Sequence, residues 1–430
     1  MTFLSKPLFI ADDFCNFILQ KLSAFLFSLG GFFMLTSLAL IFLLGLMIGS
    51  IFNKLKLPSL LGMLLTGIIL GPYALNLLDD KILTISPDLR QIALVIILTR
   101  AGLALDIEDL KKVGRPAILM CFIPALFEIT GFILLAPKLL GISILDAAIM
   151  GTVIAAVSPA VIVPKMLMLM KSGYGKSQSI PQLIMAGASV DDIFVIVLFT
   201  SFTGLATGGS FSVTSILQIP ISIILGLFLG IIFGLILSYI FKHIHLRDSM
   251  KVIIILSISF LFITLENSLK GIVPISGLLA VMSMGATLLK TYSKLANRIS
   301  IKFSKLWVGA EIFLFVLVGA TVDIKYALSS GLVVVLLILG CLIFRSFGVL
   351  SSLFKTQLNS KERVFCMIAY MPKATVQAAI GSIPLALGLD CGQIVLTVAV
   401  SAILITAPLG ALGIDITYKK LLSKESTEII

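Results

Sequence analysis

Charged side chains are scarce in this sequence: Asp, Glu, Lys and Arg make up 12% of its 430 residues, against about 25% in soluble domains. Hydrophobic residues make up 59%, and the mean hydropathy is +1.17. This composition indicates a polytopic membrane protein with one integral domain and no soluble one. The net charge of +11 does not indicate a nucleic-acid partner, because the basic residues follow the loops between apolar runs, as counted below.

Residues that build catalytic and cofactor sites are also few. The five cysteines are scattered without a C-x-x-C pair, and there are only two histidines, so we expect inert thiols and no transition-metal site. No nucleotide-binding G-x-x-x-x-G-K-[S/T] signature is found, which argues against ATP drive within this chain. Without a nucleophile–base pair, we expect neither an enzyme nor a cofactor. The N-terminus also lacks the features of a cleaved signal peptide.

Apolar runs long enough to cross a bilayer recur along the chain. Residues 14–30 are short and carry a central Lys21, so we interpret the segment 1–30 as an interfacial or extra helix. The thirteen expected spans are 31–53, 59–76, 91–106, 117–136, 143–164, 181–206, 215–241, 252–267, 272–289, 308–322, 326–354, 364–389 and 391–413. Residues 414–430 are expected to form a short tail.

Lys and Arg are distributed unequally between the two sides of this layout. Of the 32, the connections on the C-terminal side hold 22 and those on the opposite side 7, while Arg100, Arg345 and Lys373 fall inside spans. Because cytoplasmic loops carry the excess of basic residues, we expect the C-terminus in the cytoplasm and the N-terminus outside. We therefore expect a multi-pass protein of the cytoplasmic membrane.

The second half of the chain repeats features of the first. The third span ends in G-L-A-L-D-I at 102–107 and the tenth in G-A-T-V-D-I at 319–324. Pro58 and Pro274 open the second and ninth spans, and the fifth and twelfth spans are both interrupted by proline. Seven spans separate each copy from its partner, so the two halves have opposite orientations in the membrane. Inverted repeats with interrupted spans are typical of secondary transporters.

The interrupted spans carry the polar residues expected to line a cavity. Proline lacks an N–H and clashes with the preceding turn, so we expect the fifth span to break between Pro159 and Pro164, and the twelfth at Pro372 and Pro384. Exposed helix ends carry partial charges and are tolerated in a membrane only beside a cavity or protein. The supporting residues on these two spans are Ser158, Pro159, Pro164, Lys373, Thr375 and Gln377. The alternative is that the prolines merely kink packed helices.

Asp191 and Asp192 lie near the middle of the apolar run 181–206. An ionised carboxylate at that depth costs at least ~2.5 kcal/mol, and two neighbours also repel each other. Carboxylate oxygens suit a small dehydrated Na⁺ or Li⁺, and the same groups take up protons when the cation leaves. Competition of H⁺ and a cation for one site is what exchange requires. The alternative is that both aspartates pair with Arg345 and Lys373 in a closed network.

Glu128 and Arg345 are two further charges inside spans. We interpret them as a buried pair whose attraction offsets the burial of each, and the pair as structural, because Arg keeps its proton at any workable pH. Lys373 either exchanges a proton or holds the charge of the broken helix, and the sequence does not separate these roles.

Four motifs resemble a known family: S-V-D-D-I at 189–193, V-S-P-A-V-I-V-P at 157–164, G-Y-G-K at 173–176 and P-K-A-T-V-Q-A-A-I-G at 372–381. They are similar to the monovalent cation/proton antiporters, in particular the NHA-type sodium/proton exchangers, over about residues 31–413. The resemblance implies an all-α NhaA-like fold of thirteen spans and a homodimer in the lipid bilayer. It also implies Asp191 and Asp192 as the ion- and proton-binding pair, and Glu128 with Arg345 as the stabilising pair.

The resemblance also implies a division into moving and static parts. A core of about 117–206 and 326–413 would move against dimerisation helices of about 31–106 and 252–322, with 215–241 as a linker. The fifth and twelfth spans would be the crossing helices. The sequence departs from the best-known electrogenic members at Arg345, where they have lysine, so the sequence leaves open whether their two-proton stoichiometry applies here.

The function that these features favour is exchange of Na⁺ or Li⁺ for H⁺ by alternating access. The first alternative is a K⁺/H⁺ exchanger of the same fold, which would differ only in cavity size. A cation channel and a non-transporting membrane sensor are further alternatives. A channel would give single-channel currents, and a sensor needs a cytosolic effector region that residues 414–430 are too short to form.

Overall fold

The computed structural model describes residues 34–55, 57–104, 114–207, 213–269, 273, 275–323, 325 and 331–424, and all of their regular secondary structure is helical. The expected N-terminal segment 1–30 lies outside these residues, as do Asp106, Ile107, Pro274 and Ile324 of the sequence repeat. The helices are α2 (Met34–Lys54), α3 (Ser59–Leu70), α4 (Asp80–Thr84), α5 (Ser86–Ala104), α7 (Arg115–Met120), α8 (Ile123–Leu140), α9 (Ile144–Ala155), α10 (Pro159–Ser172), α11 (Ile180–Ala206), α12 (Val213–His243), α13 (Asp248–Ser268), α14 (Gly277–Thr291), α15 (Ser293–Ala320), α17 (Gly331–Ser352), α18 (Ser360–Ala369), α19 (Thr375–Ile380), α20 (Ile383–Ala386) and α21 (Gly392–Leu421).

Within the described residues, eight helical segments are long and apolar enough to cross a membrane, and four shorter apolar helices accompany them. The chain is therefore an all-α, multi-pass membrane protein, as the sequence predicts. The number of thirteen spans stays a prediction.

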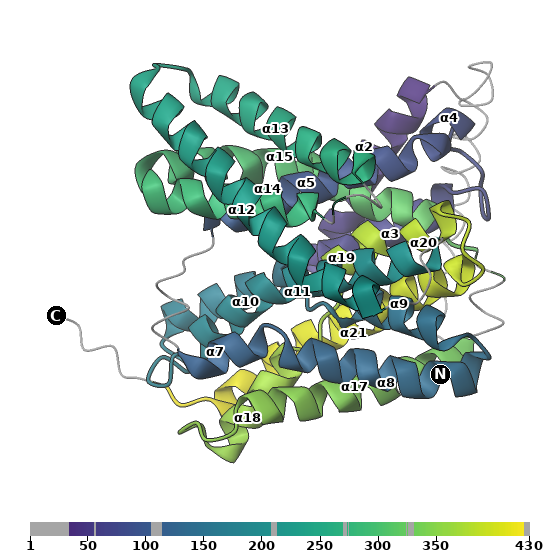
Figure 1. Cartoon of the computed structure of the whole chain (residues 1–430). Coiled ribbons are helices and arrows are strands. Elements are labelled where there is room, and N and C mark those ends of the chain that lie inside the picture. The colour runs from purple at the N-terminus through teal and green to yellow at the C-terminus, as the bar shows by residue number, and fades with distance from the viewer. Residues whose placement is uncertain are drawn as a thin grey trace, which may run out of the picture.

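The helices fall into two groups with a shared middle (Figure 1). In the view of Figure 1, α5, α13, α14 and α15 lie in the upper part and α7, α8, α17 and α18 in the lower part. Helices α9, α11 and α19 run between them. Asp191 and Asp192 lie near the middle of α11, where Asp191 is fully buried and Asp192 partly buried.

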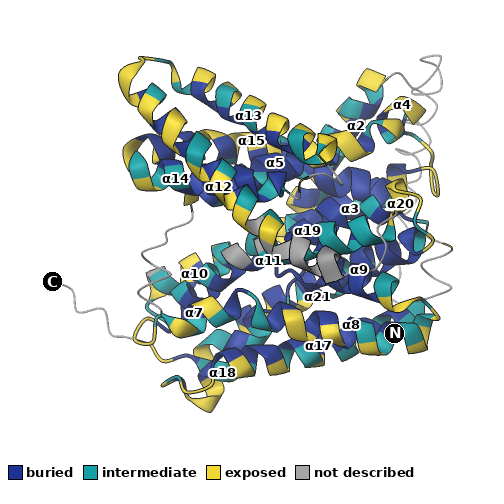
Figure 2. Cartoon of the chain, viewed as in Figure 1, coloured by how far each residue is buried: buried dark blue, intermediate teal, exposed yellow. Residues whose placement is uncertain are grey.

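Burial follows the same arrangement. Figure 2 shows mostly buried residues on α3 and α9 in the middle of the molecule, and many exposed residues along α8, α12, α13 and α17. Several of the exposed side chains are large and apolar, including Leu43 on α2, Ile253 on α13 and Leu332 on α17. Exposed apolar side chains of this kind are what the hydrocarbon core of a bilayer requires of helices that cross it.

Two glycines of the sequence repeat lie at tight helix contacts. A Cβ at Gly102 of α5 would collide with the backbone of Met282 in α14, and one at Gly319 of α15 would collide with the backbone of Leu64 in α3. Small residues let membrane helices approach closely where the hydrophobic effect supplies no attraction between them. Matching glycines of the two repeat copies therefore make equivalent contacts, each with a helix of the other copy.

The interruption of the fifth span differs from the expected position. Helix α9 ends at Ala155, residues 156–158 are extended, and α10 begins at Pro159. Pro159 occupies the first turn of α10, where a missing N–H costs no hydrogen bond, and Pro164 lies inside this helix. The expected break between Pro159 and Pro164 is therefore wrong: the interruption precedes both prolines.

Other helices extend beyond the apolar runs that predicted them. Helix α15 begins at Ser293, well before the expected span 308–322. The expected span starts too late because the first half of α15 contains lysine and arginine, which interrupt the apolar run. Helix α21 continues to Leu421, past the expected end of the last span. The fourth span is divided at Cys121 and Phe122 between α7 and α8.

Candidate functional site

The two interrupted spans meet in the interior. Helix α18 ends at Ala369 and α19 begins at Thr375, so residues 370–374 form the second interruption. The backbone N–H of Ser158, in the first interruption, donates to the carbonyl oxygen of Pro372 in the second at 2.9 Å. We call the two interrupted segments, 156–158 and 370–374, the junction.

Side chains supply the hydrogen bonds that the helix ends at the junction lack. Gln377 donates through Nε2 to the carbonyl oxygens of Ile154 at 2.9 Å and Ala156 at 2.8 Å. The backbone N–H of Lys373 donates to Oγ1 of Thr406 on α21 at 2.9 Å. Buried backbone groups without partners are costly, so these contacts allow two helices to stop inside the membrane.

Arg345 of α17 forms the centre of a buried ionic network. Its guanidinium donates to Oε2 of Glu128 at 2.7 Å and to Oδ2 of Asp191 at 3.1 Å. It also donates to the carbonyl oxygen of Tyr370 at 2.7 Å and to that of Ala155. Ala155 is the last residue of α9 and Tyr370 directly follows the last residue of α18, and carbonyls at the C-terminal end of a helix carry a partial negative charge. Arg345 therefore holds two carboxylates and two helix ends at once.

Lys373 belongs to the same network, but it pairs with Glu128 alone, whereas Arg345 pairs with Glu128 and Asp191. Its Nζ lies 2.5 Å from Oε2 of Glu128 and donates to the carbonyl oxygen of Ala155 at 3.3 Å. The side chains of Lys373, Glu128 and Arg345 are at most 2% exposed. Two cations and the two carboxylates Glu128 and Asp191 therefore balance one another in a closed, buried group.

Asp191 and Asp192 have different surroundings, although they are adjacent. Asp191 is fully buried, and its Oδ2 accepts from the backbone N–H of Val157 at 2.9 Å as well as from Arg345. Asp192 is partly buried, and within the described residues no basic side chain lies within 4.0 Å of its carboxylate. Neighbouring residues of a helix point about 100° apart, which accounts for the difference. Of the two aspartates, only Asp191 forms an ion pair within the buried network.

Four oxygen atoms at or beside the junction are buried without a hydrogen-bond partner. They are Oδ1 of Asp191, Oδ1 of Asp192, Oγ of Ser158 and Oε1 of Gln377. Unpartnered buried oxygens are rare in native proteins and call for an explanation. All four are hard oxygen ligands, the kind that small hard cations prefer.

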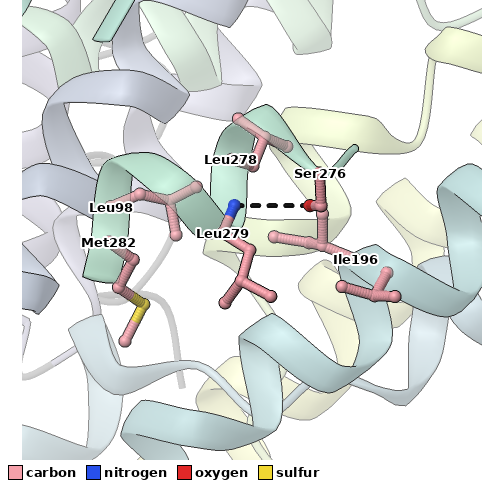
Figure 3. A pocket seen from close by; sticks show the side chains of 7 residues that line it. Leu98, Ile196, Ser276, Leu278, Leu279 and Met282 are labelled. Atoms are coloured by element: carbon pink, nitrogen blue, oxygen red, sulfur yellow. Dashed lines mark hydrogen bonds between the residues drawn. The ribbon is translucent and has the colours of Figure 1, made fainter. Parts of the chain in front are cut away.

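The interface of α11 beyond Asp192 is apolar. Leu98 of α5, Ile196 of α11 and Met282 of α14 are among the residues around a cavity of about 10 Å³. The Oγ of Ser276, beside the cavity, accepts from the N–H of Leu279 (Figure 3). Ile196 follows Asp192 by one helical turn. Leu98, Ile196 and Met282 are each at most 4% exposed, so buried apolar side chains fill this part of the interface apart from the small cavity.

A groove lies along α10, the helix that begins at the junction. It has a volume of about 570 Å³ and is lined by Pro164, Leu167, Met168 and Ser172, which share one face of α10. The C-terminal end of α10 lies beside the segment that follows α21. Just after α10, the backbone N–H of Gly175 donates to the carbonyl oxygen of Ser423 at 2.9 Å. The open groove and the C-terminal part of α21 therefore lie on the same side.

The residues singled out in the sequence are found in three groups. Asp191, Glu128, Arg345, Lys373 and Gln377 meet at the junction. Asp192 lies beside them, Ser158 contributes a backbone hydrogen bond and an unpartnered Oγ, and Thr375 is buried at the start of α19. Pro159 begins α10, and Pro164 lines the groove. Sequence reasoning missed Thr406 and the peptide N–H of Val157, and no sequence signal distinguishes either from other residues of apolar helices.

Comparison with known proteins identifies the class. The model of the family described as "Sodium/hydrogen exchanger, transmembrane" matches residues 22–420. The chain belongs to the sodium/hydrogen exchanger family. It is 33% identical to "Sodium/hydrogen exchanger 9B2" of Mus musculus over 87% of this chain and 72% of that protein, and 32% identical to "Sodium/hydrogen exchanger 9B1" of Homo sapiens over 86% and 73%.

Solved structures agree with this exchanger family in fold. The chain is similar to the sodium proton antiporter MjNhaP1 from Methanocaldococcus jannaschii, with a TM-score of 0.78 over 89% of this chain and 97% of that one, at 21% identity. The resemblance stated from the four motifs is therefore confirmed at the level of family and antiporter fold. Membership in the exchanger family supports cation/proton antiport, a transport activity and not an enzymatic one.

Proposed function

We propose that this chain exchanges Na⁺ or Li⁺ for H⁺ across the cytoplasmic membrane, with Asp192 as the carboxylate that binds cation and proton in turn. The observation that carries the proposal is that Asp192 Oδ1 is buried without a partner while Asp191 is held by Arg345 and Val157. A buried carboxylate without a protein cation is stable only when neutralised by a proton or a bound cation. Alternation between these two neutralising partners is antiport.

Asp191 supports the cation from within the network. Its Oδ2 is committed to Arg345 and Val157, but its Oδ1 has no partner. A cation between Oδ1 of Asp191 and Oδ1 of Asp192 would complete its ligand shell with hydroxyl oxygen or water. Glu128 and Arg345 stabilise the junction. Lys373 supplies the second positive charge, which together with that of Arg345 balances the charges of Glu128 and Asp191.

Alternating access is part of this proposal. In it, the groove along α10 is the approach from the side of the C-terminus, which is the cytoplasm, and the contact around Leu98, Ile196 and Met282 is the closed side. Movement of the core, about 117–206 and 326–413, against the dimerisation helices, about 31–106 and 252–322, would exchange the open and closed sides. The chain works as a homodimer, with 215–241 linking the two parts.

The test is Na⁺-dependent proton movement in proteoliposomes. Asp192→Asn should abolish it while the purified protein stays folded, because an amide has no negative charge to neutralise Na⁺ and takes up no proton when the cation leaves. Asp79→Asn is the matched control, since Asp79 caps α4 by accepting from the N–H of Lys81 and asparagine caps equally well. Undiminished exchange in Asp192→Asn would refute the assignment.

The same assay separates the alternatives. Exchange driven by K⁺ but not by Na⁺ or Li⁺ would favour the K⁺/H⁺ exchanger. Single-channel currents in a planar bilayer would indicate a channel instead.

A further inference from the structure

One peptide group at the junction connects Gln377 to Asp191. The carbonyl oxygen of Ala156 accepts from Gln377 Nε2 at 2.8 Å, and the N–H of Val157 donates to Asp191 Oδ2 at 2.9 Å. This carbonyl and this N–H belong to the same peptide bond. Peptide bonds are planar and trans, so the carbonyl and the N–H point in opposite directions within the plane, and Gln377 and Asp191 lie at opposite edges of this peptide group.

We infer that Gln377 is a positioning residue, which aims the N–H of Val157 at Asp191 by holding the carbonyl of Ala156. The inference rests on the proposed function and names a further residue of its site. Residues 156–158 are outside both α9 and α10, so no helical hydrogen bond fixes the rotation of this peptide. The amide of Gln377 supplies the missing constraint.

The orientation of the Gln377 amide is determined by its contacts. Its two partners, the carbonyl oxygens of Ile154 and Ala156, are both acceptors, so only the NH₂ side of the amide can face them. The side chain is fully buried, so bulk solvent does not replace either bond. The two N–H groups of the Gln377 amide donate to two carbonyl oxygens, which fixes the orientation of the amide. The amide in turn fixes the orientation of the peptide between Ala156 and Val157.

The connection also has an electrostatic effect. A donor on the carbonyl oxygen polarises the peptide, and a polarised N–H is a stronger donor to the next acceptor. The chain from Gln377 through the peptide to Asp191 thus strengthens the bond that keeps Asp191 Oδ2 in place. With Oδ2 fixed, Oδ1 is held in the direction from which it can contact a cation.

The test compares Gln377→Met with Thr152→Val. Methionine keeps the volume of glutamine but donates no hydrogen bond. Thr152 is a fully buried residue of α9 whose hydroxyl donates only to the carbonyl of Ile149 in its own helix, so its replacement removes a buried hydrogen bond without touching Asp191. We expect Gln377→Met to raise the apparent KM for Na⁺ about tenfold, the size of effect that one misplaced contact has on a bound ligand, with maximal turnover changed about twofold or less.

A purely structural role predicts a different pattern. It would lower thermal stability or turnover in both variants alike and leave KM unchanged. An unchanged KM in Gln377→Met, or an equal rise in Thr152→Val, would overturn the inference. Combination with Asp191→Asn adds a second readout: a glutamine that acts through Asp191 should have little further effect on Na⁺ binding, measured as KM or as the Na⁺-induced rise in Tm. Equal effects in both backgrounds would also overturn it.

The outcome is distinguishable from failure of the proposed function. If the wild-type protein shows no exchange of Na⁺, Li⁺ or K⁺ for H⁺, the proposed function itself is wrong. If wild type exchanges and Asp192→Asn does not, but Gln377→Met has the wild-type KM, the inference about Gln377 alone is wrong.

Discussion

Replacing Glu128 by glutamine should destabilise the protein strongly, because one carboxylate oxygen holds both cations of the buried network. Oε2 of Glu128 lies 2.7 Å from Arg345 and 2.5 Å from Lys373, and all three side chains are at most 2% exposed. In Glu128→Gln, two buried cations face a single carboxylate, Asp191. Removing one partner of a buried ion pair costs about 3–5 kcal/mol. With an unfolding entropy of about 2.1 cal/mol/K per residue, this corresponds to a fall in Tm of roughly 3–6 °C for a chain of this length.

A second substitution tests whether charge balance is the reason. Glu128→Gln combined with Lys373→Met leaves Arg345 and Asp191 as a neutral pair, so the double variant should recover part of the lost Tm. Thermal unfolding can be followed with a thiol-reactive dye, because Cys121, Cys341, Cys366 and Cys391 are buried in the folded protein. A Glu128→Gln variant as stable as wild type, or a double variant that has lost the sum of both single losses, would refute the reasoning.

Two further predictions concern access and packing. The first uses a variant without reactive cysteines and a membrane-impermeant thiol reagent added from the side of the C-terminus. Met168→Cys in the groove should react, whereas Ile196→Cys in the apolar contact beyond Asp192 should not. Equal reactivity of the two cysteines would contradict the proposal that the contact around Ile196 is closed. Gly319→Leu should lower folded yield and Tm because its side chain collides with the backbone of α3 near Leu64, whereas Gly204→Leu, at a helical glycine whose added Cβ meets nothing within 4 Å, is the control. A Tm of Gly319→Leu equal to that of the control would show that α3 and α15 are not in contact.

The fold and part of the site could be predicted because they follow from local properties of the sequence. Apolar runs and the distribution of Lys and Arg give the helical membrane class, and charges inside apolar runs mark Asp191, Asp192, Glu128 and Arg345. Glu128 and Arg345 do lie within 2.7 Å of each other, although their stabilising role remains a prediction. Family and antiporter fold were predicted correctly from the four motifs.

The pairing of charges could not be predicted, because it depends on which helices meet. Nothing in the sequence tells whether Lys373 faces Glu128 or an aspartate, and the structure places it against Glu128. The position of the first break was mispredicted because proline was treated as the breaking residue, whereas Pro159 is compatible with the start of a helix. Contacts made by backbone groups, such as that of Val157 with Asp191, have no sequence signature.

Proton release on addition of Na⁺ tests the central claim most directly. In weakly buffered solution, the purified wild-type protein should release protons when Na⁺ or Li⁺ is added, because the cation displaces the proton from Asp192. Asp192→Asn should release none, and Asp79→Asn should behave as wild type. Release that persists in Asp192→Asn, or its absence in a wild-type protein that exchanges Na⁺ for H⁺ in proteoliposomes, would contradict competition at this carboxylate.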